Sequence, residues 1–223
     1  MSNWLKRALF GGGLYALGSL VFVVFVPSQT TLPAEAKPQQ GAVIVNRLVG
    51  ETIVVKQSEG PDNDWTSVIE VRLEPNGTVP FMHVHDGYDE VFEVLSGKIA
   101  FELSSGRQVL RAGEQLTIGR GQAHVPSNPF AEPASFRVTV SSIPSFTSCI
   151  AQTHRRLGDA SSSWVIRHIR VGRLALACDM YLSTIPVWVQ AVGMTLSAPI
   201  LEALGFPVYE PMVNVPMNES NSE

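Results

Sequence analysis

Short runs of alternating apolar and polar residues, separated by turn-forming residues, fill the middle of the chain. Thr66–Leu73, Ile99–Leu103 and Phe136–Val140 show the two-residue period of β-strands. No helical period of useful length occurs among them. Many short strands with turns at intervals of roughly 8–12 residues are typical of a β-sandwich or β-barrel. We therefore expect an all-β domain over residues 42–145, with a hairpin turn at Ser96-Gly97.

A long uncharged segment precedes this domain. Ala8–Val26 contains nineteen residues without a charged side chain, enough to cross a hydrocarbon core of about 30 Å. Lys6 and Arg7 directly before it favour a cytoplasmic N-terminus and an extracytoplasmic domain. The small-x-small sequence Ala34-Glu35-Ala36 also fits signal-peptide cleavage, although the apolar run is longer than a typical signal. We interpret residues 1–27 as a transmembrane anchor or signal peptide, with a buried soluble helix as the alternative.

The chain changes character again after the β-rich segment. Residues 146–217 begin with an arginine-rich stretch that ends at Arg173, and an apolar run with two internal prolines, Leu174–Phe206, follows. Because proline interrupts helices, we expect two or three short helices here. A basic, aromatic-containing stretch before apolar helices fits a position on the membrane surface. The alternative is that these helices pack on the β-domain or at a homodimer interface. Residues 218–223 are polar, and we expect a disordered tail.

Other residues outside the β-domain give simpler predictions. Residues 28–41 are rich in proline, glutamine and threonine and are interpreted as a linker. Cys149 and Cys178 either pair in an oxidising exterior or remain two buried thiols. His154 and His168 have no metal-binding spacing and are interpreted as solvated residues.

The composition limits the classes of partner. Hydrophobic residues make up 45% of the 223 residues and charged residues only 16%, below the roughly 25% usual for soluble domains. This apolar content excludes a disordered chain and suggests that some apolar residues face lipid. The net charge of −4 and the isoelectric point near 5.7 provide no attraction to nucleic acid. We therefore expect a membrane and a small molecule as partners, and no nucleic acid.

Three of the five histidines have spacings that suit a metal site. His83 and His85 are two residues apart, so both rings point to the same face of a strand. Glu90 lies in the next strand, and His124 lies near the end of another. Three imidazoles and one carboxylate suit a divalent metal and leave coordination positions open, whereas a structural zinc site would more often use thiolates. We predict that His83, His85, Glu90 and His124 bind iron, manganese, nickel, copper or zinc.

These residues resemble the two sequence motifs of the cupin superfamily. The first motif, G-x5-H-x-H-x3/4-E-x6-G, is matched by Gly77, His83, His85, Glu90 and Gly97. The second, G-x5-P-x-G-x2-H-x3-N, is matched by Gly113, Gly121, His124 and Asn128, with Gly119 in place of its proline. The resemblance is to small single-domain cupins of type 2, with a quercetinase-like, RmlC-type barrel. It implies a double-stranded β-helix (a jelly-roll β-barrel) with the metal inside.

The resemblance to quercetinase-like dioxygenases implies a metal-dependent oxidoreductase in which Glu90 acts as the catalytic base. The motifs alone fit a second hypothesis equally well: a non-catalytic module at the membrane surface that binds a metal or a small ligand. A sugar isomerase would need polar residues inside the barrel, whereas the expected wall residues Val91, Ile99, Phe101 and Leu116 are apolar. We therefore expect a small, fairly apolar substrate.

Overall fold

The computed structural model describes residues 2–25, 37–58, 65–141, 143 and 145–210. The ten strands of the β-rich part are β1 (Val43–Asn46), β2 (Glu51–Gln57), β3 (Ser67–Leu73), β4 (His83–Val84), β5 (Glu90–Ser96), β6 (Lys98–Leu103), β7 (Gly106–Arg111), β8 (Gln115–Ile118), β9 (His124–Ser127) and β10 (Ala134–Val140). The remaining elements are α1 (Asn3–Phe25), α2 (Phe146–Gly158), α3 (Trp164–Gly172), α4 (Ala175–Cys178), β11 (Tyr181–Leu182) and α5 (Val187–Ala203). The predicted cleavage sequence, most of the predicted linker and the predicted tail lie outside the described residues.

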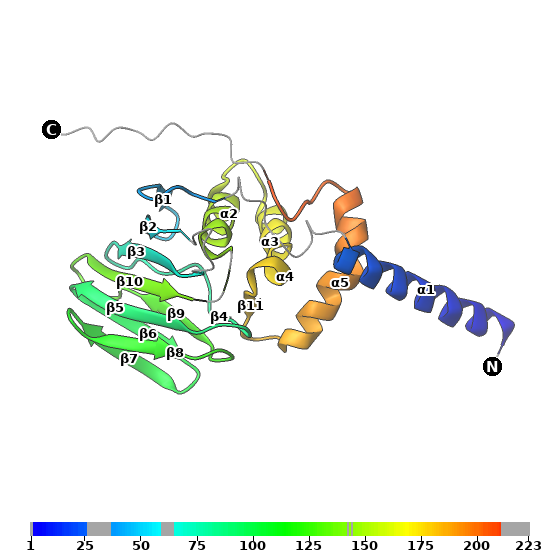
Figure 1. Cartoon of the computed structure of the whole chain (residues 1–223), viewed down its shortest axis with the longest axis horizontal. Helices are drawn as coiled ribbons and strands as arrows, with labels where there is room; N and C mark the ends of the chain where they lie inside the picture. The colour runs from blue at the N-terminus through cyan, green and yellow to red at the C-terminus, as the bar shows by residue number, and fades with distance from the viewer. Residues whose placement is uncertain (1, 26–36, 59–64, 142, 144, 211–223) are drawn as a thin grey trace.

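The strands form two antiparallel sheets that pack face to face (Figure 1). The six-stranded sheet has the order β1-β2-β3-β10-β5-β8, and the five-stranded sheet has the order β11-β4-β9-β6-β7. Alternate residues of β3 and β10 are buried, as the period-two pattern predicts. Their inward-facing residues pair across the ladder, for example Phe136 with Val71 and Val138 with Ile69. This antiparallel sandwich confirms the cupin-type arrangement of strands.

Two details of the expected fold are wrong. Among the described residues no ladder joins an edge strand of one sheet to an edge strand of the other, so the sheets do not close into a barrel. Ser96-Gly97 is not a hairpin turn, because β5 and β6 belong to different sheets. Gly97 instead lies at the corner where the chain crosses between sheets, with a φ of 71°. A Cβ there would lie 2.9 Å from the Cβ of Ala134, so the corner requires glycine.

Asn128 holds the turn before the metal-binding motif in place. Its side-chain amide donates hydrogen bonds to the carbonyls of Leu73, Glu74 and Glu132, at 3.1, 3.2 and 2.9 Å. Its backbone N–H donates to the carbonyl of Gly77 at 2.8 Å. The side chain is fully buried, so its amide must find its hydrogen-bond partners within the protein. Asn128 therefore ties together three segments of local backbone.

The C-terminal helices pack against the sandwich, and the segment also extends the five-stranded sheet. Helix α2 contacts β1 and β3, and β11 pairs with β4 through Tyr181–Val84 and Leu182–His83. A disulfide joins Cys149 on α2 to Cys178 at the end of α4. Of the two alternatives that the sequence left open, the paired cysteines are therefore correct and the two buried thiols are not.

Three arginines of the basic stretch are used inside the protein. Arg156 is fully buried and donates hydrogen bonds to the backbone carbonyls of Val208 and Arg170. Arg170 pairs with Asp159 and Glu210, and Arg173 pairs with Glu202. These contacts join the basic stretch to other parts of the C-terminal segment. Together with the contacts of α2 to β1 and β3, they favour packing within the protein over a position on the membrane surface for this stretch.

Helices α1 and α5 lie against each other on the far side of α2–α4 from the sheets (Figure 1). The hydroxyl of Tyr15 donates a 2.7 Å hydrogen bond to the carbonyl of Leu196, and Ser19 and Ala198 are buried. Helix α1 is a candidate membrane span by length and composition, with a mean hydropathy of 2.0 over Trp4–Phe25 and little of its surface buried.

Candidate metal centre

The two sheets bring the four predicted metal ligands together. His83 begins β4, Glu90 begins β5 and His124 begins β9, while His85 directly follows β4. His83 and His124 are paired residues of neighbouring strands, and their ring centroids are 4.4 Å apart. One ligand atom from each of the four residues lies within 4.8 Å of all the others. All four side chains are buried.

Each histidine is oriented by a hydrogen bond at its outer ring nitrogen. Nδ1 of His83 bonds the carbonyl of Phe81 at 2.9 Å, and Nδ1 of His124 bonds the carbonyl of Gln122 at 3.0 Å. Nδ1 of His85 bonds the carbonyl of Asp179 at 2.7 Å. Since a carbonyl only accepts, each Nδ1 carries the proton and each Nε2 lone pair remains available. This arrangement is typical of metal-ligating histidines.

A short contact at the centre of the cluster requires a cation. Oε2 of Glu90 lies 2.7 Å from Nε2 of His124 and 3.6 Å from Nε2 of His85. Among the described residues, neither Glu90 Oε2 nor His124 Nε2 has a hydrogen-bond partner of acceptable geometry. Two buried acceptors at this distance repel each other unless a proton or a metal ion lies between them. The residues therefore fit a bound divalent metal.

The charges within the cluster agree with this interpretation. Burial opposes ionisation of Glu90, but the nearby His85 and His124 outweigh it and hold the pKa of Glu90 at about 2. Burial alone would lower the pKa of His124, but the contact with Glu90 outweighs it and raises this pKa. Burial, followed by the neighbouring His124 and His85, lowers the pKa of His83 to about 3. A metal ion held by Glu90 and His124 would take the place of a proton between them, so its binding would release a proton.

Two residues that support His85 were not predicted from the sequence. Asp179, which supplies the carbonyl to Nδ1, adopts a left-handed conformation with a φ of 46°. Its carboxylate accepts hydrogen bonds from the backbone N–H groups of Asp86 and Gly87. Tyr88 stacks on the ring of His85, with centroids 4.3 Å apart. No sequence pattern links Asp179 to a histidine 94 positions away; the position of Tyr88 between His85 and Glu90 was the only available signal.

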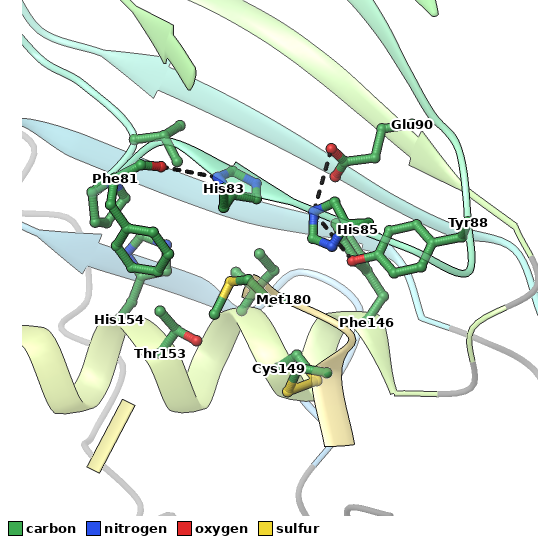
Figure 2. A pocket seen from close by; sticks show the side chains of 14 residues that line it. Phe81, His83, His85, Tyr88, Glu90, Phe146, Cys149, Thr153, His154 and Met180 are labelled. Atoms are coloured by element: carbon green, nitrogen blue, oxygen red, sulfur yellow. Dashed lines mark hydrogen bonds and ion pairs between the residues drawn. A yellow bond between two sulfur atoms is a disulfide. The ribbon is translucent and has the colours of Figure 1, made fainter. Parts of the chain in front are cut away.

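A cavity adjoins the four residues on the side covered by α2 (Figure 2). Its volume is about 50 Å³, several times the roughly 10–15 Å³ that one water molecule needs by the same measure. Its apolar lining includes Val79, Phe146 and Ile150, so the apolar character predicted for the site agrees with the structure. The residues expected to form its walls do not line it: Ile99 and Phe101 belong to the core between the sheets, and Val91 is 37% exposed.

Two further ionisable residues lie beside this region. His154 on α2 lines the same cavity, and with Glu51 at the start of β2 it also lines an adjoining cavity that shares His83 and Glu90. His154 and Glu51 are 5% and 3% exposed. The interpretation of His154 as solvated is therefore wrong, because α2 turns this residue toward the sandwich. His168 is exposed, as predicted. The sequence carries no motif that marks Glu51 or His154, since both lie outside the cupin pattern.

Comparison with known proteins identifies the family of the β-domain. Residues 69–141 match the family model of the cupin domain. No curated protein matches the chain. A sugar phosphate isomerase of the cupin superfamily from Silicibacter pomeroyi is similar in structure, with 22% identity, a TM-score of 0.38 and coverage of 51% of this chain and 76% of the other.

Two further solved structures show similarity over the same domain. The polyketide cyclase RemF from Streptomyces resistomycificus is 20% identical, with a TM-score of 0.40 and coverage of 47% of this chain and 78% of the other. A cupin protein from Bacteroides fragilis is 26% identical, with a TM-score of 0.33 and coverage of 34% of this chain and 65% of the other. The family match, the strand order and the four clustered side chains agree. Residues 69–141 of this chain therefore form a domain of the cupin superfamily.

Proposed function

We propose that the protein is a metal-dependent oxidoreductase, dioxygenase-like, that acts on a small and fairly apolar substrate. The observation that carries the proposal is the 2.7 Å contact between the buried Glu90 Oε2 and His124 Nε2, beside a largely apolar cavity. His83, His85, Glu90 and His124 would hold the metal. A metal with open positions supplies Lewis-acid and redox chemistry to a substrate oxygen.

The chain's own residues supply binding and proton transfer at this site. The apolar lining from Val79, Phe146 and Ile150 excludes water around a small substrate. Glu90 is the proposed catalytic base, because it lines the cavity and its Oε2 has no hydrogen-bond partner among the described residues. The carbonyls of Phe81, Gln122 and Asp179 keep the imidazoles in the tautomer that leaves Nε2 free.

We further propose that the domain is exported and attached to the membrane through α1. Helix α1 has the length of a span, and its sides are largely exposed. The disulfide Cys149–Cys178 is typical of an oxidising exterior. Helix α5 packs against α1. It supports a second contact with lipid, because its residues Trp188, Val192 and Ile200 expose 50–70% of their surface. Since α1 meets α5 through its C-terminal half, α5 would lie in the outer leaflet.

Oxygen consumption tests the proposed activity. The full chain in detergent, loaded with one metal at a time, is incubated with a panel of enols and dicarbonyl compounds in an oxygen electrode. We expect oxygen uptake that depends on both metal and substrate and falls at least 100-fold in Glu90→Gln, as general-base catalysis is worth about 10²–10⁴. His168→Ala, at an exposed histidine of α3, serves as the control. Tight binding of metal and ligand without oxygen uptake would instead support a non-catalytic binding module.

A further inference from the structure

A second group of buried polar residues lies at the two adjoining cavities, outside the cupin motifs. Glu51 begins β2, Asn46 ends β1, and Thr153 and His154 lie on α2. All four side chains are at most 5% exposed. Oε2 of Glu51 lies 3.4 Å from Nδ1 of His154. Thr153 and His154 line the cavity described above, Glu51 and His154 line the adjoining one, and both cavities are also lined by His83 and Glu90.

Asn46 determines which ring nitrogen of His154 carries the proton. The Oδ1 atom of Asn46 accepts a hydrogen bond from the backbone N–H of Leu48 at 3.2 Å. The amide nitrogen therefore faces Nδ1 of His154, at 3.4 Å, as a donor. Nδ1 is then an acceptor, and the neutral ring carries its proton on Nε2.

Glu51 must also be neutral in this arrangement. An ionised carboxylate close to an acceptor nitrogen in a buried site would be repelled, whereas a protonated carboxyl is not. Burial alone raises the pKa of Glu51 to about 8 and lowers the pKa of His154 to about 4. Both groups are therefore uncharged near neutral pH, and each offers a proton to a hydrogen-bond acceptor.

The fold leaves two of these groups without partners. Within the described part of the chain, Glu51 Oε2 and Thr153 Oγ1 are buried and have no hydrogen bond. A buried polar group without a partner destabilises the folded protein, and a ligand that supplies the missing partner would remove this cost. Thr153 lines the cavity beside His83, His85 and Glu90, and Glu51 lines an adjoining cavity. His83, Glu90 and His154 line both cavities.

We propose that Glu51, Thr153 and His154 form a substrate-recognition site that hydrogen-bonds a carbonyl oxygen of a ligand whose second oxygen binds the metal. The inference rests on the proposed function, because it assigns a substrate class to the same cavity. The site offers donors and no cation, so it takes a neutral carbonyl rather than a carboxylate. The apolar lining from Val79 and Ile150 requires a hydrocarbon part. The substrate class is thus a small, neutral compound with two oxygen functions.

Ligand affinity in matched variants tests this site. The probes are 2,4-pentanedione and 2,5-hexanedione, with 2-hexanone as the single-carbonyl control, titrated calorimetrically under nitrogen into the metal-loaded full chain in detergent. We expect at least one diketone to bind at least tenfold more tightly than 2-hexanone. Glu51→Leu should abolish this advantage, whereas Glu51→Gln, which keeps a donor, should retain it within about threefold. Thr153→Val, which keeps the shape, should weaken binding about three- to tenfold.

Metal content measured on the same samples separates the two proposals. We expect equal metal content in the wild type, Glu51→Leu, Glu51→Gln and Thr153→Val, because none of these residues is a ligand. A wild type that takes up no metal would contradict the proposed function. A wild type that takes up metal but shows no preference for a diketone, or equal preference in Glu51→Leu, would overturn the recognition site while leaving the metal centre intact.

Discussion

Replacing Glu51 by glutamine should change how the stability of the protein depends on pH. Glu51 is 3% exposed, and burial raises its pKa from 4.5 to about 8 in the folded protein. Below pH 4.5 the carboxyl is protonated in both the folded and the unfolded state. Between pH 4.5 and 8 only the unfolded state loses the proton, so the unfolded state is favoured as the pH rises.

The magnitude follows from the size of the pKa shift. One pKa unit corresponds to about 1.4 kcal/mol, so a rise from 4.5 to about 8 removes about 5 kcal/mol of stability across this interval. Glutamine has nearly the same shape and no ionisable proton. The free energy of unfolding of the wild type should therefore fall, relative to that of Glu51→Gln, by about 1.4 kcal/mol per pH unit. His154 acts in the opposite direction, since its pKa is lowered to about 4, but it is present in both proteins and largely cancels in the difference.

Urea unfolding at pH 5, 6 and 7 measures this difference. The full chain in detergent is followed by circular dichroism, with a chelator present so that metal binding does not contribute to stability. The carbonyl stretching band of a protonated carboxyl, measured by infrared difference between the two proteins, reports directly on Glu51. Two results together would contradict the raised pKa of Glu51. The difference in unfolding free energy between the wild type and Glu51→Gln would stay constant with pH, and the band of the protonated carboxyl would already disappear below pH 6.

Three further predictions concern the framework of the site. Replacing Cys149 and Cys178 together by serine should lower the free energy of unfolding by about 3.5 kcal/mol, the loop-closure cost for a separation of 29 residues. Reducing agent should have no further effect on the urea unfolding of this variant. A stability equal to that of the wild type would contradict the prediction. Asn128→Ala should cost about 3–4 kcal/mol, because three backbone carbonyls lose their donor; Ser127→Ala, which removes a single 3.4 Å bond, should cost less than about 1 kcal/mol. Two variants in liposomes test the position of α5: one keeps Trp188 on α5 as its single tryptophan, and the other keeps Trp164 on α3. Brominated lipids should quench the fluorescence of the first variant and leave that of the second unchanged. Equal quenching would contradict the proposed position of α5.

The sequence predicts the β-domain and its four metal ligands because both depend on local patterns. The period-two alternation in β3 and β10 follows from the burial of one face of each strand. The spacing of His83 and His85 directs both rings to one face of the strand. The motif offsets then place Glu90 and His124 in the strands that complete the cluster.

The parts that could not be predicted depend on contacts between distant residues. Strand pairing decides that Gly97 connects two sheets, and the flanking alternation is the same for a hairpin. The carbonyl of Asp179 reaches His85 only because β11 pairs with β4. His154 lies in an arginine-rich stretch that resembles a solvated surface, yet α2 packs this stretch against the sandwich. The contribution of the C-terminal segment to the cavity could therefore not be predicted from the sequence.

The metal content of the purified protein tests the central claim most directly. The full chain, purified in detergent without oxygen, is compared with the double variant His83→Ala/His124→Ala and with His168→Ala, an exposed histidine outside the cluster. We expect close to one equivalent of a divalent metal in the wild type and in His168→Ala, and at least a tenfold lower content in the folded double variant. Equal metal content in all three proteins, or no metal in the folded wild type even after incubation with each candidate ion, would contradict it.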